Sequence, residues 1–436
     1  MSLAASLAAP SSSTEVSIHP RRTVRVLFIN DTARNGGPGR SLHSILKFLD
    51  PAVVHRAVVL PRDGAVARLL STDGVVDQLH FVPDIIENPI EPWTRPMERT
   101  DFEAAAAWKV ARFGGNMLRA ARAVVRLSRL VRSGRFDLVY CNGSSADFAG
   151  GALVAITKVP ALWHVRYTSL PRATASLHRR LSAQDGVRRI VCVSRAAAAL
   201  FPHCAHKVAV IHNALDVGSF DPSRVRGTLR SELGLGRDVV VFGSHGRVLR
   251  RKGYVEMVRA ARIVLDRMTE RERANVAFAV VGDTPEDFRP DHVEECRALA
   301  AELGMGAQFH MLGFRDDVRP LVADFDVAVV PSVYPDPLPR AVIESMALCK
   351  PVIAFDVGGV VEMLDDGVTG SVVHFAPDDP AAGVDRLAGV MLRYARDAEL
   401  RARQGRAARD RVEREFDARA HAARIQNEIV VASGLG

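Results

Sequence analysis

The sequence predicts an α/β protein made of two domains, each with a parallel β-sheet. Three observations indicate this fold class. Short runs of apolar, β-branched residues alternate with stretches of helical periodicity, this alternation begins again after Asp238, and 436 residues are many for one hydrophobic core. Strands that alternate with helices form parallel sheets, because each helix carries the chain back to the start of the next strand.

The composition is that of a globular protein without a transmembrane helix. The chain is 48% hydrophobic and 25% charged, and no apolar run approaches the roughly 18 residues that a spanning helix needs. Five scattered cysteines, an odd number, predict a reducing cytoplasmic location. The net charge of +8 suits anionic substrates or an anionic membrane surface. No nucleic-acid-binding signature is visible, so we expect no nucleic-acid partner.

The first domain is expected over residues 22–215, after a disordered leader over 1–21 that is rich in Ala and Ser. Its first strand, 24–30, leads into a loop that contains Gly36 and Gly37. Backbone N–H groups at such a strand-to-helix junction can bind an anion. The loop does not match the dinucleotide fingerprint, so its glycines either contact a ligand or only form the turn.

Further strands of this domain are predicted at 57–60, 136–140, 160–165, 189–194 and 208–213. Polar side chains at or beyond two of these strand ends are Asn142, His164 and Arg166. Ligands of parallel sheets bind beyond the carboxyl ends of the strands, so these three residues are candidates for substrate contacts. A buried structural histidine is the common alternative for His164.

A long helical region over 102–135 is strongly basic. Four of its arginines recur at steps of three and four residues: Arg119, Arg122, Arg126 and Arg129. We expect the apolar residues of the region to lie opposite them, among them Leu118 and Val125. The solvated face of a packed helix explains this pattern. Docking on an anionic membrane through Arg119 to Arg132 is the alternative.

The second domain is expected over 237–412, after a linker over 216–236 and before a terminal helix over 413–436. Its first strand, 239–242, is followed by Arg247 and Lys252 just before a predicted helix. A planar guanidinium, a lysine point charge and a helix N-terminus together form a clamp for a diphosphate. Later strands, 276–281 and 308–312, end at glycines.

One run near the C-terminal end contains the remaining candidates. A strand over 326–330 is followed by a loop, a helix that begins near Pro339 and a second strand over 351–355. In such a βαβα unit, polar residues beyond the strands gather at one rim. Here the rim contains the acids Asp336, Glu344 and Glu362 and the glycines Gly358 and Gly359. A surface position is the common explanation for a single acid, but several spaced parts together indicate a site.

These parts resemble the donor-site signature of the retaining nucleotide-sugar glycosyltransferases of family 4. Asp336, seven residues, Glu344 and Gly-Gly-x-x-Glu form one part, and Gly-Arg-x-x-x-x-Lys-Gly around Arg247 and Lys252 forms the other. The resemblance covers residues 24–429. It implies the GT-B fold, in which two Rossmann-like domains face each other across a cleft and a C-terminal helix returns to the first domain.

The resemblance also implies a reaction. A hexosyl group would pass from a UDP- or GDP-sugar to a hydroxyl of a glycan, glycolipid or small-molecule acceptor, with retention at the anomeric carbon. No cofactor and no metal are expected, because Arg247, Lys252 and a helix terminus would stabilise the departing diphosphate. The Asp324-Phe-Asp326 motif is not expected to bind a metal. Two alternatives stay open, a GT-B sugar-nucleotide 2-epimerase and a non-catalytic sugar-nucleotide-binding subunit.

The resemblance assigns roles to residues of both domains. The donor would be bound by Gly36, Gly37, Arg247, Lys252, Gly282, Asp283, Phe314, Asp336, Leu338, Pro339, Arg340 and Glu344. The catalytic residues would be Asp336, Arg247, Lys252 and His164. The acceptor, a glycan or lipid-linked sugar, would contact Asn142, His164 and Arg166, in the cytoplasm or at the inner face of the cell membrane.

Two positions depart from the family pattern. The first acid of the signature is usually Glu and is Asp336 here. The frequent Pro-Phe-Gly after it is Pro337-Leu338-Pro339, which removes a backbone N–H at Pro339. The signature therefore leaves the identity of the donor sugar open.

Overall fold

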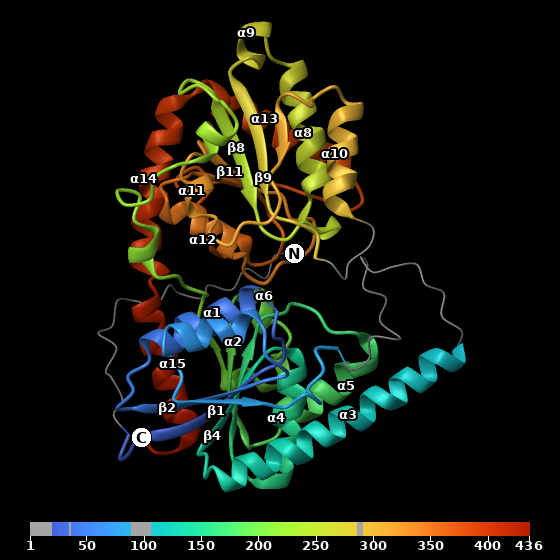
Figure 1. Ribbon diagram of the computed structural model, residues 1–436, viewed down its shortest axis with the longest axis vertical. Helices are drawn as coiled ribbons and strands as arrows, with labels where there is room; N and C mark the ends of the chain where they lie inside the picture. The colour runs from blue at the N-terminus through green and yellow to red at the C-terminus, as the bar shows by residue number, and fades with distance from the viewer. Residues whose placement is uncertain (1–19, 35, 89–105, 286–290) are drawn as a thin grey trace, which may run out of the picture.

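The computed structural model describes residues 20–34, 36–88, 106–285 and 291–436, and it contains two parallel sheets (Figure 1). The first sheet has the strand order β3-β2-β1-β4-β5-β6-β7 and the second β10-β9-β8-β11-β12-β13. The predicted α/β fold class is confirmed. Most of the expected leader (1–19) and the beginning of the basic helical region (102–105) lie outside the described residues.

The strands of the first sheet are β1 (Val24–Asn30), β2 (Val54–Leu60), β3 (Gln78–Phe81), β4 (Leu138–Asn142), β5 (Ala161–Val165), β6 (Val187–Cys192) and β7 (Val208–Val210). Its helices are α1 (Gly37–Phe48), α2 (Ala65–Thr72), α3 (Ala106–Ser133), α4 (Ser144–Thr157), α5 (Arg172–Ser182) and α6 (Arg195–Ala198). Short 3₁₀ turns follow at η1 (Pro202–Lys207) and η2 (Val217–Phe220). Phe28 packs into one core, and Leu27 and Ile29 pack into another. The apolar run of β1 is therefore buried on both faces of the sheet.

The strands of the second sheet are β8 (Val240–His245), β9 (Val276–Val281), β10 (Phe309–Met311), β11 (Val327–Val330), β12 (Val352–Phe355) and β13 (Gly370–Val373). Its helices are α7 (Leu229–Glu232), α8 (Tyr254–Asp266), α9 (Glu270–Arg273), α10 (His292–Glu302), α11 (Arg319–Val322), α12 (Arg340–Ala347), α13 (Pro380–Arg396) and α14 (Ala398–Glu415). The 3₁₀ turns η3 (Arg250–Lys252) and η4 (Gly358–Glu362) follow the strands β8 and β12.

The last helix, α15 (Ala418–Ser433), returns to the first domain, as predicted (Figure 1). Ile425, Ile429 and Val430 share a core with Phe28 of β1. Glu428 accepts a hydrogen bond of 2.6 Å from Arg189 of β6. The terminal helix α15 thus follows α14 of the second domain in the chain and packs against the first domain.

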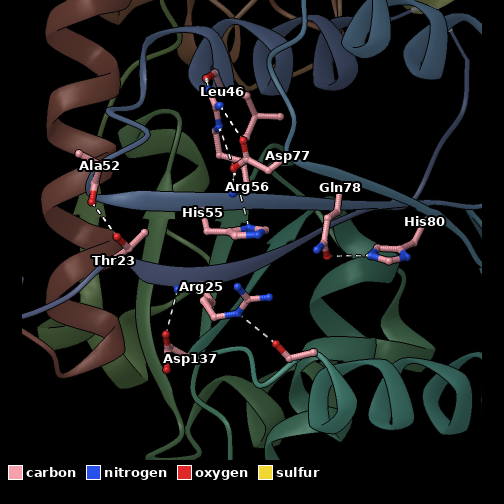
Figure 2. Close-up of polar contacts among 11 residues, drawn as sticks. Thr23, Arg25, Leu46, Ala52, His55, Arg56, Asp77, Gln78, His80 and Asp137 are labelled. Atoms are coloured by element: carbon pink, nitrogen blue, oxygen red, sulfur yellow. Dashed lines mark hydrogen bonds and ion pairs between the residues drawn. The ribbon is translucent and has the colours of Figure 1, made fainter.

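Polar contacts at the amino-terminal edge of the first sheet hold its strands in place (Figure 2). Arg56, near the start of β2, donates to Asp77 before β3 at 3.0 Å and to the Leu46 carbonyl at 3.2 Å. The backbone N–H of Arg25 in β1 donates to Asp137 before β4 at 2.9 Å. These contacts hold the amino ends of the strands in place. The carboxyl ends of the strands face the second domain (Figure 1).

The basic helix α3 corrects one expectation. Ala123, Leu127 and Val131 form its buried stripe. Leu118 and Val125, expected opposite the arginines, are 54% and 46% exposed. Leu118 and Val125 face solvent because Ala123, Leu127 and Val131 occupy the side of the helix that packs against the core. Among the described residues, no helix is both long and apolar enough to cross a membrane.

Candidate active site

A cavity of about 550 Å³ lies between the two domains, beyond the carboxyl ends of both sheets. Residues from the ends of β5, β8 and β11 line it, which is where ligands of parallel sheets bind. All residues expected at the donor site contribute to its wall: Gly36, Gly37, Arg247, Lys252, Gly282, Asp283, Phe314, Asp336, Leu338, Pro339, Arg340 and Glu344. The structure thus brings these residues together, and their roles remain predictions.

Glu344 is held in the second turn of α12. Its side chain is only 8% exposed, and it accepts hydrogen bonds from Arg340 Nε and His245 Nε2, both at 3.0 Å. Burial works against the carboxylate, but the Arg340 charge and the His245 hydrogen bond outweigh it and lower the pKa of Glu344 to about 2. Glu344 is therefore ionised at neutral pH and fixed in one orientation.

Lys252 and Asp336 form an ion pair at the cavity wall. Lys252 ends the turn η3, and Asp336 lies in the loop before α12. Burial disfavours the ammonium group, but the Asp336 carboxylate outweighs burial and raises the pKa of Lys252. The ring of Tyr334 lies 5.7 Å from Lys252 Nζ. The cation expected for the diphosphate and the acid expected for the sugar are therefore neighbours.

Arg247 occupies a different setting in the loop after β8. It is exposed at the cavity wall, and no carboxylate pairs with it within the described ranges of the chain. Its guanidinium donors are thus available to a ligand in the cavity. The cavity wall as a whole contains seven Arg or Lys residues and three Asp or Glu residues, so its net charge is positive.

Glycines shape the loops that carry the ion pair. Gly253, with φ of +74°, follows Lys252, and a Cβ there would lie 1.7 Å from the Pro331 carbonyl oxygen. Gly358 has φ of +72°, and a Cβ there would lie 2.3 Å from the Asp336 carbonyl oxygen. The N–H of Gly359 donates to that same oxygen at 2.8 Å. The Gly-Gly pair therefore supports the Asp336 loop and does not itself line the cavity.

Replacement of Gly358 by Ala is expected to destabilise the protein by about 2–4 kcal/mol, because it combines a left-handed backbone with a clash against the Asp336 loop. Gly367 is a matched control, since its φ is +74° but no atom lies within 4 Å of a Cβ placed there. Gly367→Ala should cost only about 1 kcal/mol. Urea unfolding of both variants measures the difference, and equal losses would show that the close contact has no effect.

Glu362 was expected at the rim of the site, and the structure corrects this. It accepts hydrogen bonds from the backbone N–H of Arg195 at 2.9 Å and of Ala196 at 3.3 Å, and it pairs with His212 at 3.0 Å. All three partners belong to the first domain. Glu362 lies outside the cavity wall because the start of α6 takes up its carboxylate, so it is a contact between domains.

Other hydrogen bonds close the cavity from the side of the first domain. Arg340 donates to the Ala214 carbonyl at 3.1 Å while its Nε holds Glu344. Thr168 donates to the Pro335 carbonyl at 2.6 Å, on the loop that carries Asp336. The first domain therefore contacts the helix that carries Glu344 and the loop that carries Asp336.

Of the three residues expected at the acceptor side, only Arg166 lines the cavity. Its Nε donates to Asn142 at 2.8 Å, and its Nη1 donates to Asn213 at 2.5 Å. Asn142 and His164 are fully buried. Both contact Arg166 from behind the cavity wall, and their direct contact with a substrate stays a prediction.

The catalytic role expected for His164 stays a prediction, and the structure places this residue behind the cavity wall. Its Nδ1 is hydrogen-bonded to the Tyr140 hydroxyl inside the sheet. Burial, reinforced by the nearby Arg166 charge, lowers the pKa of His164 well below its usual range. Because it lies within β5 rather than beyond the end of that strand, its ring points into the domain. Its Nδ1 also lies 3.4 Å from Arg166 Nη2.

Sequence reasoning missed several residues of the cavity wall, and two of them contact predicted site residues. His245, the last residue of β8, binds Glu344, and Tyr334 packs beside Lys252 and Arg251. A polar residue at the carboxyl end of a strand was the signal for His245, the same signal that selected His164. Tyr334 carries no comparable signal, because an aromatic residue in a loop is not specific for any role.

Both carboxylates of the Asp324-Phe-Asp326 motif accept hydrogen bonds from other residues of the protein. Asp326 accepts from Arg230 Nη2 at 2.6 Å and from the Val241 N–H at 2.8 Å, and Asp324 accepts from the Arg230 N–H at 2.9 Å. Among the residues whose placement is known, no three His, Cys, Asp or Glu side chains form a group suited to a metal ion.

Two Rossmann-like domains that share one cavity form the GT-B arrangement, and matches to known proteins define the chain as a glycosyltransferase. Residues 225–411 match the family "Glycosyl transferases group 1", and residues 106–219 match "Glycosyltransferase Family 4". The protein is a member of glycosyltransferase family 4, within the group 1 glycosyl transferases.

Curated relatives agree with this family. Alpha-maltose-1-phosphate synthase of Mycobacterium tuberculosis is 32% identical over 226 residues, which are 50% of this chain and 54% of that protein. D-inositol 3-phosphate glycosyltransferase of Streptomyces avermitilis is 35% identical over 207 residues, 46% of this chain and 42% of that protein. The chain spans about half the length of these relatives.

Solved structures with the same fold cover nearly the whole chain. HepE of Anabaena, crystallised in complex with UDP, aligns with a TM-score of 0.72 and 21% identity over 92% of this chain and 98% of that one. A glycosyltransferase from Rickettsia africae aligns with a TM-score of 0.69 and 19% identity over 93% and 98%. At this level of identity the likeness shows the fold.

Proposed function

We propose that this glycosyltransferase moves a hexosyl group from a UDP- or GDP-sugar to an acceptor hydroxyl, with retention at the anomeric carbon and without a metal ion. The observation that carries the proposal is the Lys252–Asp336 pair in the cavity wall, with Arg247 nearby in the same wall. A sugar and a diphosphate that occupied this end of the cavity would meet an acid and two cations at the bond that breaks.

The charges that develop in the reaction match these residues. Cleavage of the bond between the anomeric carbon and the diphosphate oxygen leaves positive charge on the sugar and negative charge on the diphosphate. Lys252 and Arg247 stabilise the diphosphate, and Asp336 accepts a hydrogen bond from a sugar hydroxyl. The acceptor oxygen bonds to the anomeric carbon, and its proton passes to the departing phosphate oxygen on the same face.

Glu344 binds the ribose in this proposal. Its two oxygens are each held by one donor, from Arg340 and His245, and a carboxylate has further lone pairs for the two ribose hydroxyls. Because Arg340 also reaches Ala214 in the first domain, it links the ribose contact to the position of that domain. Closure of the domains would exclude water and suppress hydrolysis of the donor.

Arg166 gives the acceptor side a distinct chemistry. It is a half-buried cation whose side-chain partners are Asn142, Asn213 and His164, and none of the described carboxylates pairs with it. Burial is the main cause that lowers the pKa of Arg166 to about 10. An anionic group would relieve the cost of this unpaired charge. We therefore propose a glycan, glycolipid or small-molecule acceptor that carries a phosphate or another anion, as the names of the two relatives above also suggest.

Replacement of Arg166 by Lys tests the acceptor side. The variant keeps a positive charge but loses the planar fork, so we expect the acceptor KM to rise by about 10- to 100-fold. Donor affinity, measured by calorimetry with UDP or GDP, should stay unchanged because Arg166 belongs to the first domain and bonds to side chains of that domain. A similar loss of nucleotide affinity would contradict the assignment of Arg166 to the acceptor side of the cavity.

Product analysis tests the reaction itself. UDP- and GDP-hexoses are incubated with candidate acceptors in the presence and absence of EDTA, and the products are followed by NMR. We expect a glycoside with the anomeric configuration of the donor, formed equally well with EDTA. Inversion at carbon 2 of the donor would instead identify an epimerase, and nucleotide-sugar binding without any product would identify a binding subunit.

We also propose that the reaction takes place in the cytoplasm, where the sugar-nucleotide donor would be at hand. The five cysteines are free thiols, which supports a reducing compartment.

A further inference from the structure

Four residues of α3 form one exposed stripe that neither the fold nor the cavity uses. Leu118, Arg122, Val125 and Arg129 follow one another at steps of four, three and four residues, so they lie along one side of the helix. All four are exposed, whereas Ala123, Leu127 and Val131 on the other side are buried. Figure 1 shows α3 on the outside of the first domain, with its beginning reaching beyond α5. We call these four residues the α3 stripe.

The apolar part of this surface is unusual within the molecule. Twelve large hydrophobic side chains are exposed in the part of the chain that the structure describes, and five of them belong to α3: Trp108, Val110, Met117, Leu118 and Val125. Single exposed apolar residues need no explanation, but a concentration on one helix marks an interaction surface.

The charged part of the helix has only one sign. Between Ala106 and Ser133 there is no Asp or Glu, and the cations are Lys109, Arg112, Arg119, Arg122, Arg126, Arg129 and Arg132. Three of these arginines serve the domain. Arg119 donates to the Pro83 carbonyl at 3.0 Å, Arg126 pairs with Asp84 at 2.8 Å and Arg132 donates to the Ile156 carbonyl at 2.9 Å.

Arg122 and Arg129 are different, because no described residue accepts a hydrogen bond from them or forms an ion pair with them. Arg122 lies between Leu118 and Val125 on this side of the helix, and Arg129 lies one turn after Val125. The stripe therefore combines two uncompensated cations with two exposed aliphatic side chains. This is the composition of a helix that lies in the interface of a bilayer, with its apolar groups below the headgroups and its arginines on anionic lipid.

We propose that the α3 stripe docks the protein on an anionic phospholipid surface. A nucleic acid or an acidic protein would account for the arginines but not for exposed Leu118 and Val125. A second copy of this chain would account for the aliphatic groups but would bring like charges together. Docking does not depend on the transfer reaction, although a glycolipid acceptor would give it a purpose.

Vesicle flotation with the full chain tests the docking. The vesicles are phosphatidylcholine with or without phosphatidylglycerol, at low salt, and no sugar nucleotide is added. We expect the protein to float with the anionic vesicles only. The variants Arg122→Glu/Arg129→Glu and Leu118→Ser/Val125→Ser should each reduce the bound fraction by about tenfold, because one removes the charge and the other the inserted groups.

A matched control separates the stripe from the net charge. Arg403 and Arg406 are exposed on α14 of the second domain, and Arg403→Glu/Arg406→Glu makes the same change in charge. This variant should float like the unaltered protein. Three outcomes would overturn the proposal: no flotation of the unaltered protein, an equal loss in the α14 control, or a dimer in sedimentation that Leu118→Ser/Val125→Ser abolishes. Turnover with a water-soluble acceptor, measured separately, tests the proposed function and not the docking.

Discussion

Replacement of Lys252 by Ala is expected to lower kcat by about 10²- to 10³-fold, because it removes a preorganised cation from the position where the diphosphate gains charge. The same change leaves Asp336 buried without its partner, and breaking a buried ion pair costs about 3–5 kcal/mol of stability. The measurements are steady-state turnover with a saturating sugar nucleotide and urea unfolding of the same preparation.

A double variant separates catalysis from folding. Lys252→Ala/Asp336→Asn removes both charges, so it should recover much of the lost stability but none of the lost turnover. Arg259→Ala, which removes an exposed cation from the neighbouring helix α8, should leave both quantities unchanged. Unaltered turnover in the Lys252 variant would exclude this residue from the site.

Replacement of Glu344 by Gln is expected to weaken binding of the nucleotide sugar by about 10- to 100-fold, which corresponds to one or two lost hydrogen bonds to a charged acceptor. The amide also places an NH₂ group against Arg340 or His245, so the remaining acceptor is poorly held. Glu344→Ala should abolish measurable transfer while the protein stays folded. Calorimetry with UDP and GDP measures the affinity, and an unchanged dissociation constant would remove Glu344 from the ribose contact.

The free energy of unfolding should depend on the ionisation of Glu344 at low pH. The pKa of Glu344 is lowered in the folded state from an ordinary value of 4.5 to about 2. A carboxylate with a lowered pKa stabilises the fold fully above its unfolded pKa, and this contribution is lost as the pH falls through the folded pKa. The difference in unfolding free energy between the unaltered protein and Glu344→Gln should therefore be constant above about pH 5 and shrink below pH 4.5. If this difference in unfolding free energy grew as the pH falls, Glu344 would not be stabilised in its ionised form by the fold.

Much of the donor half of the site was accessible from sequence because its parts are local. A buried strand, a glycine turn and a helix start fix where Lys252 and Glu344 lie relative to their own sheet, and strands β1 and β9 begin and end where the apolar runs do. Two strands were missed, β3 and β13. β3 is a four-residue edge strand with partly exposed residues, and β13 is equally short and starts at Gly370, so neither has a clear apolar run.

The apolar periodicity and the spaced motifs of this chain determined two parallel sheets, most of their strands, and the residues at the donor end of the cavity. Only the tertiary structure decided that Lys252 pairs with Asp336, 84 residues away, that Glu362 serves the first domain, and that His164 stays inside β5. The type and position of an apolar strand or helix follow from neighbouring residues, and so they can be inferred from sequence. Which distant groups meet depends on how the strands and helices pack within a domain and on how the two domains pack together, and this packing leaves no periodic pattern in the sequence.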